Sequence, residues 1–345
     1  MILVDVVSNK EDWSNALIRF DSWDFYHTWD FHEISARNGE GKPVLFKVSL
    51  GDEQLIFPLL SRNILGTQYK DLTSVYGYPS FLYTGTCPET FNKLWHALLN
   101  YLESKGYVSL FSRLNPLLAY DAISEQIAKP VGNVVYIDLQ RSESEQLQAY
   151  RSNHRRDIRK LERMGVQCQA SEGVGESFDA FIANYNVTMD KLAADEYYFF
   201  SREYYKQLLN ANNFTAKIYS CYLEGEIIAS GIFTFCGDFV QYHLGGTHPD
   251  YVRLAPTKIM FDQVRKDATH LGFKKFSLGS GLGFRDDGLF NFKKGFSDST
   301  AAFGVINAVI NKKIYSELSR GIESDTGFFP LYRAVTAEEV LATAL

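Results

Sequence analysis

Residues 44–50 read VLFKVSL and residues 54–60 read QLIFPLL, two apolar runs separated by a turn at Gly51. The second half of the chain repeats this arrangement, with AKIYSCYL at residues 216–223, a turn at Gly225 and IIASGIFTF at residues 227–235. Apolar runs of this length around a glycine turn predict β-hairpins. The sequence therefore predicts two copies of one structural unit.

A helix and a further strand follow each predicted hairpin. The helical runs, residues 89–104 and 256–270, end near Gly106 and Gly272, the residue type that commonly terminates a helix. Apolar strands follow at residues 107–112 and 273–278. Equivalent glycines lie about half of the 345-residue length apart, so we predict two tandem domains of similar α/β fold.

We place the first domain at residues 1–141 and the second at residues 142–310. A C-terminal tail, residues 311–345, is expected to pack back on the first domain. Helices that open the second domain are predicted at residues 142–166, 177–189 and 201–209, and a strand at 301–310 precedes a helix at 314–318.

Composition excludes several classes of protein. A hydrophobic content of 46% can fill two cores, and no run of about 18 apolar residues or export signal is present, so we expect a cytoplasmic protein without a transmembrane segment. A net charge of −6 opposes a protein whose whole surface binds DNA. The four cysteines form no CxxC pair and predict neither a zinc site nor a disulfide framework.

The predicted helix at residues 142–166 carries a basic face. Arg155, Arg156 and Arg159 lie on neighbouring stripes of this helix, which ends at Gly165. Such a face attracts phosphate groups. The alternative is an ordinary solvated helix surface.

Residues 289–296, LFNFKKGF, place Lys293 among apolar side chains. Leu289, Phe292 and Phe296 are expected to bury one face and to fix the stem of Lys293. A fixed ammonium could stabilise the oxyanion that develops in acyl transfer. The alternative is a surface lysine beside core aromatic residues.

The remaining motifs do not indicate a catalytic or cofactor site. The loop LGSGLG at residues 278–283 lacks the glycine spacing and acidic partner of a dinucleotide site, so we interpret it as a turn that could line a pocket. The spacing of His243 and His248 does not suit a helical metal pair, and no GxSxG motif is present. We therefore expect neither a metal nor a covalent acyl-enzyme.

The order of these parts resembles the FemABX family, in which two GNAT-type acyltransferase folds are joined in one chain. The residues that carry the resemblance are the basic stretch 155–166, the TMDK turn at 188–191, Tyr204 and Tyr205, Gly245 and Gly246, Ala255 and Pro256, and FKKGF at 292–296. The resemblance covers most of the chain, and its FKxxF element is the most specific part.

The resemblance implies an α/β fold with two tandem GNAT-like domains and a catalytic role for Lys293. It further implies that Arg155, Arg156 and Arg159 contact phosphates of the donor or acceptor. Substrate-binding positions implied in the same way are Tyr204, Tyr205, Gly245, Gly246 and Asn115. Asn115 departs from the family, whose members have an aspartate before proline there, and an amide cannot bind a cation as a carboxylate does.

Family members transfer aminoacyl groups from tRNA to peptidoglycan precursors, so the resemblance implies a charged tRNA as donor and no tightly bound cofactor. An acyl-CoA donor is the alternative. Ordinary GNAT enzymes bind its pyrophosphate with backbone N–H groups at a helix start. Here residues 253–258, RLAPTK, contain no glycine, and Pro256 lacks an N–H donor.

Three functional hypotheses follow. The first is transfer of an aminoacyl or other acyl group to an amine of a cell-envelope saccharide or nucleotide-sugar precursor. The second is an acyl-CoA-dependent N-acyltransferase that acts on an amino sugar for surface polysaccharide. The third is a non-catalytic saccharide-binding protein of the same fold. Asp190 and Asp286 are candidate general bases for the enzymatic hypotheses.

Overall fold

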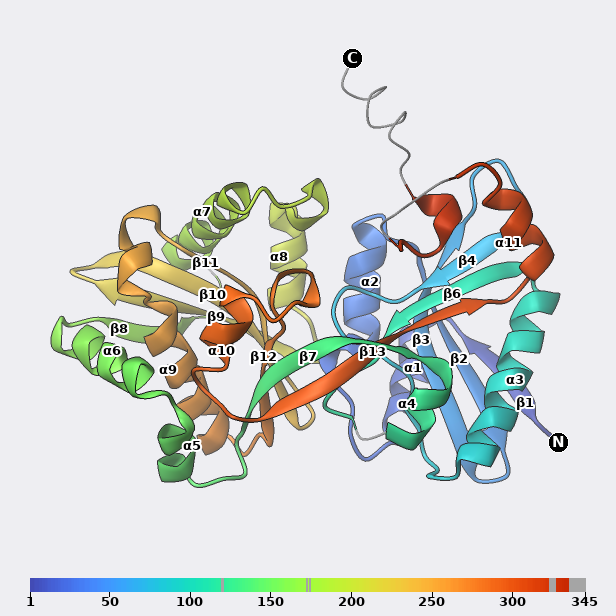
Figure 1. The fold of residues 1–345 in the computed structure, drawn as a ribbon, viewed down its shortest axis with the longest axis horizontal. Helices are drawn as coiled ribbons and strands as arrows, with labels where there is room; N and C mark the ends of the chain where they lie inside the picture. The colour runs from blue at the N-terminus through green and yellow to red at the C-terminus, as the bar shows by residue number, and fades with distance from the viewer. Residues whose placement is uncertain (119–120, 172, 174, 323–326, 335–345) are drawn as a thin grey trace, which may run out of the picture. The chain divides into compact units, whose positions relative to one another are not determined.

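The computed structural model describes residues 1–118, 121–171, 173, 175–322 and 327–334. The chain forms two compact units, the first made of residues 1–21, 26–131 and 303 onward, the second of residues 22–25 and 132–302 (Figure 1). The units divide after residues 131 and 302, inside strands, whereas we predicted boundaries after 141 and 310. Residues 335–345 of the predicted tail lie outside the described residues.

The first unit is a mixed sheet with helices around it. Its strands, in spatial order, are β1 (Leu3–Val7), β2 (Lys42–Leu50), β3 (Glu53–Asn63), β4 (Lys70–Thr73), β6 (Tyr107–Arg113) and β13 (Thr300–Val309), with β5 (Leu82–Tyr83) paired to β3. Only the β4–β6 pair is parallel among these neighbours. Its helices are α1 (Lys10–Leu17), α2 (Trp29–Arg37), α3 (Pro88–Ser104), α4 (Asp121–Ile127) and α11 (Lys312–Leu318).

The second unit repeats the same plan. Its strands, in spatial order, are β7 (Lys129–Asp138), β12 (Lys275–Gly279), β11 (Phe239–Thr247), β10 (Glu226–Cys236), β9 (Thr215–Leu223) and β8 (Gln167–Ser171). The β11–β12 pair is parallel and the others are antiparallel. Its helices are α5 (Glu143–Ala149), α6 (Ser152–Arg163), α7 (Glu176–Lys191), α8 (Arg202–Leu209), α9 (Thr257–His270) and α10 (Gly288–Lys293).

The predicted repeat is confirmed element by element. The β2–β3 hairpin corresponds to β9–β10, and in each unit a long helix leads into the second strand of the single parallel pair. Gly106 and Gly272 follow these helices with φ of +79° and +84°, the left-handed conformation that glycine adopts without strain.

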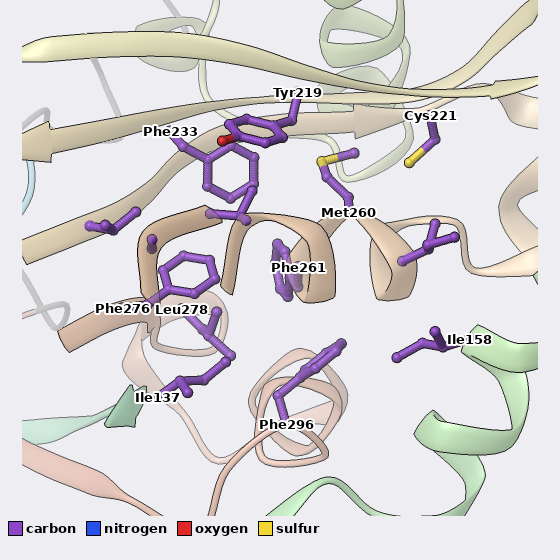
Figure 2. Close-up of a cluster of buried hydrophobic side chains, with 14 of the residues drawn as sticks. Ile137, Ile158, Tyr219, Cys221, Phe233, Met260, Phe261, Phe276, Leu278 and Phe296 are labelled. Atoms are coloured by element: carbon purple, nitrogen blue, oxygen red, sulfur yellow. The ribbon is translucent and has the colours of Figure 1, made fainter. Parts of the chain in front are cut away.

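The core of the second unit lies between α9 and the sheet. Figure 2 shows Phe261 of α9 between the strand residues Tyr219 and Phe233 and the loop residue Phe296. The ring centroids of Phe261 and Phe296 are 5.3 Å apart, and Phe296 is fully buried. Burying a phenylalanine side chain contributes about 2 kcal/mol. This packing fixes the segment that follows α10.

Two local predictions are wrong. Residues 142–166 do not form one helix, because the chain is extended at Tyr150 and Arg151, between α5 and α6. The ring of Tyr150 is buried against Phe296, and the backbone N–H of Arg151 donates to Gly295 at 2.8 Å, so tertiary contacts favour the break. Residues 188–191 form the last turn of α7 instead of an irregular turn.

Candidate active site

The parallel strands β11 and β12 separate at one point in the second unit. Their pairing ends at Gln241 and Ser277, although β11 continues to Thr247. Beyond this point β12 changes register against β7 near Gly279, whose φ is +81°. The register of β11 against β10 also shifts, leaving His243 as an extra residue in a bulge. Bulges of this kind are common next to active sites.

Lys293 lies where the two strands separate. It is the last residue of α10, it is 6% exposed, and its Nζ atom donates to the backbone oxygen of Ser280 at 2.6 Å. The same Nζ atom is 6.0 Å from the centre of the Tyr242 ring on β11. A Cβ atom added at Gly279 would lie 3.3 Å from Nζ, so a glycine at this position leaves room for the ammonium.

The apolar residues that fix Lys293 differ in part from those predicted. Phe296 is buried as expected and Phe292 is partly buried, but Leu289 is 37% exposed. Phe290 is buried instead, in the helix that Asp287 caps at its start. The prediction for Leu289 was therefore wrong by one position on the helix.

The pKa of Lys293 is lowered to about 8. Burial is the main cause, and the carboxylate of Asp287 partly opposes it. Asp287 accepts hydrogen bonds from the backbone N–H groups of Phe290 and Leu282, both at 2.9 Å, which hold the pKa of its own carboxyl below the usual range. The candidate bases Asp190 and Asp286 are exposed, and Asp287 is the carboxylate that acts on Lys293.

The ammonium retains donors for a substrate. Among the residues that the structure describes, Ser280 supplies the hydrogen-bond acceptor of Lys293. An ammonium carries three N–H donors, so two remain. In a site of low dielectric constant, such donors stabilise a developing negative charge more strongly than they would in water. The geometry therefore suits oxyanion stabilisation.

Helix α6, which contacts the segment of Lys293 through Arg151 and His154, also carries a row of arginines. An open hollow of about 770 Å³ is lined by Ser152, Arg155, Arg156, Arg159, Glu162 and Arg163. Arg155 donates to the backbone oxygens of Leu147 and Gln148 at the end of α5, whereas Arg156 and Arg159 are exposed. Four cations against one carboxylate make the hollow suitable for an anion.

Helix α6 has a second acidic residue, Asp157, which binds a lysine outside the hollow. Asp157 lies 2.6 Å from the buried Nζ atom of Lys258 at the start of α9, and 3.4 Å from the Nε atom of Arg156. Lys258 is the main cause of the lowered pKa of Asp157. Asp157 therefore divides its charge between Lys258 and Arg156, and its shorter contact is with Lys258.

The other predicted binding residues of the second unit are more buried than the arginines of α6. Tyr204 and Tyr205 of α8 are buried, and the hydroxyl of Tyr204 is 3.4 Å from Nε2 of His243. A Cβ atom at Gly246 would lie 2.2 Å from the backbone oxygen of Asn184, so this glycine lets α7 approach β11. A Cβ atom at Gly245 would lie 2.4 Å from the Tyr242 hydroxyl. Their contact with substrate stays a prediction.

Asn115 belongs to the first unit. It follows β6, is 4% exposed, and accepts a hydrogen bond from the backbone N–H of Leu117 at 2.9 Å. Its role in acceptor binding stays a prediction.

Sequence reasoning missed Ser280, Asp287, Tyr242 and His154. Asp287 had a usable signal, since Asp-Gly before an apolar run is typical of a helix start. Ser280 lies in the loop that we expected to line a pocket, but a backbone acceptor has no side-chain signature. No group of three metal-ligating side chains occurs in the part of the chain that the structure describes. No helix in the described ranges has the length and apolar character needed to cross a membrane.

Residues 148–294 match the family model described as "Acetyltransferase (GNAT) domain". The matched range begins just before α6 and includes Lys293, so it contains the whole candidate site of the second unit. This match confirms the prediction of an acyltransferase. No curated protein matches the sequence.

Three solved structures are similar over most of this chain. The structure of FemX has a TM-score of 0.69 at 13% identity and covers 91% of this chain and 99% of its own. A C-terminal domain assigned to a lysylphosphatidylglycerol synthetase of Agrobacterium fabrum has a TM-score of 0.54 at 12% identity, with coverage of 86% and 90%. L-PGS from Bacillus licheniformis has a TM-score of 0.52 at 14% identity, with coverage of 88% and 93%. The similarities confirm the predicted α/β fold, whose second unit contains the GNAT domain match, and show that this fold resembles that of FemX.

Burial of Lys293 predicts a measurable cost in stability. Burial lowers the lysine pKa from 10.5 to about 8. At a pH where the lysine is charged in both the folded and the unfolded protein, this shift lowers the free energy of unfolding by roughly 3 kcal/mol. We expect Lys293→Met to raise the free energy of unfolding at pH 7 by roughly 1 to 3 kcal/mol, because the thioether needs no compensating charge.

Proton linkage determines how the stability difference between the Lys293→Met variant and the parent depends on pH. Below pH 8 the folded and unfolded states both carry the charge and the cost is complete, whereas above 10.5 neither does. The advantage of the Lys293→Met variant in urea unfolding should therefore shrink as pH rises from 8 to 10.5. A variant less stable than the parent at pH 7 would contradict this account, and Lys313→Met, on the surface of α11, is the control.

Proposed function

We propose that the chain transfers an aminoacyl group from an ester donor to an amine of a cell-envelope saccharide or nucleotide-sugar precursor. The observation that carries the proposal is the buried ammonium of Lys293, with its lowered pKa and two N–H donors not used by Ser280. A lysine on the surface would be solvated, and its ammonium would not be held in one position toward a substrate. The alternative of a surface lysine is therefore disfavoured.

The reaction is a direct attack of the amine nitrogen on the ester carbonyl. A C–N bond forms, the carbonyl oxygen becomes an oxyanion in the tetrahedral intermediate, and the C–O bond of the ester then breaks. The proton lost by the amine is taken up by the leaving alkoxide, with a phosphate of the substrate as the proposed relay. Lys293 stabilises the oxyanion and remains protonated throughout.

The start of α9 supports an ester donor over acyl-CoA. Pro256 stands immediately before this helix and supplies no N–H donor, and Lys258 in its first turn is buried in an ion pair with Asp157. Pyrophosphate binding at a helix start needs free backbone donors and uncompensated positive charge. A charged tRNA, bound through the arginines of α6, is therefore the proposed donor.

An acyl-CoA donor remains the second candidate, favoured by the match of residues 148–294 to an acetyltransferase domain. Parallel transfer assays with charged tRNA and with acetyl-CoA, using an amino-sugar nucleotide as acceptor, separate the two donors. Turnover with the first supports the proposal, and turnover with acetyl-CoA alone overturns it in favour of the alternative. Saturable saccharide binding without turnover of either donor would instead support the binding-protein hypothesis.

Loss of the ammonium should slow transfer strongly. We expect Lys293→Met to lower kcat at least about 100-fold, the effect typical of removing one oxyanion donor. In the parent enzyme, transfer should fall as pH rises through about 8, because the lysine loses its proton there. Lys293→Arg should lose this falling limb, since a guanidinium stays charged. An unchanged kcat in Lys293→Met would remove Lys293 from the mechanism.

The arginine row should contribute to donor binding through phosphates. Arg156→Ala and Arg159→Ala are each expected to weaken binding of a deacylated tRNA and to lower the slope of log Kd against log salt by about 1. Both side chains are exposed, so the fold should be unaffected. Lys313→Ala, a surface charge on α11, serves as the control, and equal salt slopes in all variants would contradict the assignment.

A further inference from the structure

The last turn of α10 is bound by groups from the first turn of α6. The guanidinium of Arg151 donates to the backbone oxygen of Asn291 at 3.1 Å, and its backbone N–H donates to the oxygen of Gly295 at 2.8 Å. Nε2 of His154 lies 3.0 Å from the backbone oxygen of Phe292. The carbonyl oxygens at the end of a helix lack intrahelical N–H partners and accept hydrogen bonds from donors outside the helix. The oxygen of Phe292 also accepts from the backbone N–H of Gly295 at 2.9 Å. Arg151 and His154 therefore cap α10 from another helix.

His154 can act only as a donor toward Phe292, because a carbonyl oxygen has no proton to give. Its burial lowers the pKa of the ring to about 4, with Lys258 contributing in the same direction, so the ring is neutral near pH 7. The single ring proton is then assigned to Nε2. The ring is also 4.7 Å from that of Phe296, which fixes its orientation.

Gly295 completes this arrangement. A Cβ atom at this position would lie 2.2 Å from Nε2 of His154, far inside contact distance. The imidazole thus occupies the space that a side chain of residue 295 would need. Only a glycine lets His154 reach the carbonyl of Phe292.

We infer that Arg151 and His154 are positioning residues that fix the ammonium of Lys293 by capping α10, the helix that ends with it. The inference rests on the proposed role of Lys293 and extends it to α6, whose neighbouring arginines are the proposed phosphate contacts. Phe292, whose carbonyl His154 binds, is directly bonded to Lys293. The contact therefore links α6 to the backbone of Lys293 through one peptide unit, and that backbone sets the starting point of the side chain that carries the ammonium.

The pKa of Lys293 depends on how deeply its ammonium is buried, so a titration of this lysine measures its positioning independently of transferase activity. The groups that face its ammonium are Asp287, from the loop before α10, and Tyr242, from β11. His154 faces Lys258 of α9, together with Arg151 and Asp157. If the cap is lost, α10 loosens, water reaches Nζ, and the pKa should rise from about 8 toward the ordinary 10.5.

The experiment is an NMR titration of protein labelled with ¹³C at lysine Cε, with the signal of Lys293 assigned by its absence in Lys293→Met. We expect a midpoint near pH 8 in the parent, an upward shift in His154→Ala, and a value near the parent in His154→Gln, whose amide can donate to the same carbonyl. Lys160→Ala, an exposed residue of α6, is the control.

A second pair of variants tests the contact between His154 and the carbonyl of Phe292 by changing glycines instead of the histidine. Gly295→Ala should displace the imidazole and shift the titration as His154→Ala does, whereas Gly288→Ala, whose Cβ would meet nothing within 4 Å, should not. A Lys293 midpoint that stays near 8 in folded His154→Ala and Gly295→Ala overturns the inference. Failure of the proposed function appears separately, as unchanged transfer by Lys293→Met.

Discussion

The candidate site in the second unit depends on the burial of one ammonium group, that of Lys293. A charge in a medium of low dielectric constant is unfavourable unless nearby groups compensate for it. Here the compensation comes from the backbone oxygen of Ser280, the ring of Tyr242 and the carboxylate of Asp287. The same low dielectric constant that makes Lys293 costly to bury makes its ammonium effective against a developing negative charge.

The surrounding backbone is arranged to make this burial possible. Gly279 adopts a left-handed conformation and leaves space beside Nζ, and β11 and β12 stop pairing just before this point. Asp287 starts α10 and binds the N–H of Leu282, so one carboxylate links the loop after β12 to the helix that carries Lys293. The separation of β11 from β12 and the capping of α10 by Asp287 thus both help to place Nζ of Lys293.

Helix α6 has two faces with different physical roles. Its buried face, with His154, Ile158 and Leu161, packs into the core, while its exposed face carries the arginine row. Because His154 contacts the segment of Lys293 directly, the helix that carries the arginine row and the helix that carries Lys293 are packed together. Asp157 of the same helix pairs with Lys258 as well as with Arg156, and the ion pair with Lys258 links α6 to α9.

The repeat, the hairpins, the long helices and the basic face were predictable from sequence, because apolar periodicity and glycine punctuation are local properties. The burial of Lys293 was also predictable, from the aromatic residues around it, whereas its catalytic role stays a prediction. The environment of its ammonium was not predictable. The break at Tyr150, the carbonyl of Ser280 and the contact between His154 and Phe292 depend on pairs of residues far apart in the chain. Which side chain meets which backbone oxygen is decided only when the helices pack, because a carbonyl group leaves no trace in the sequence.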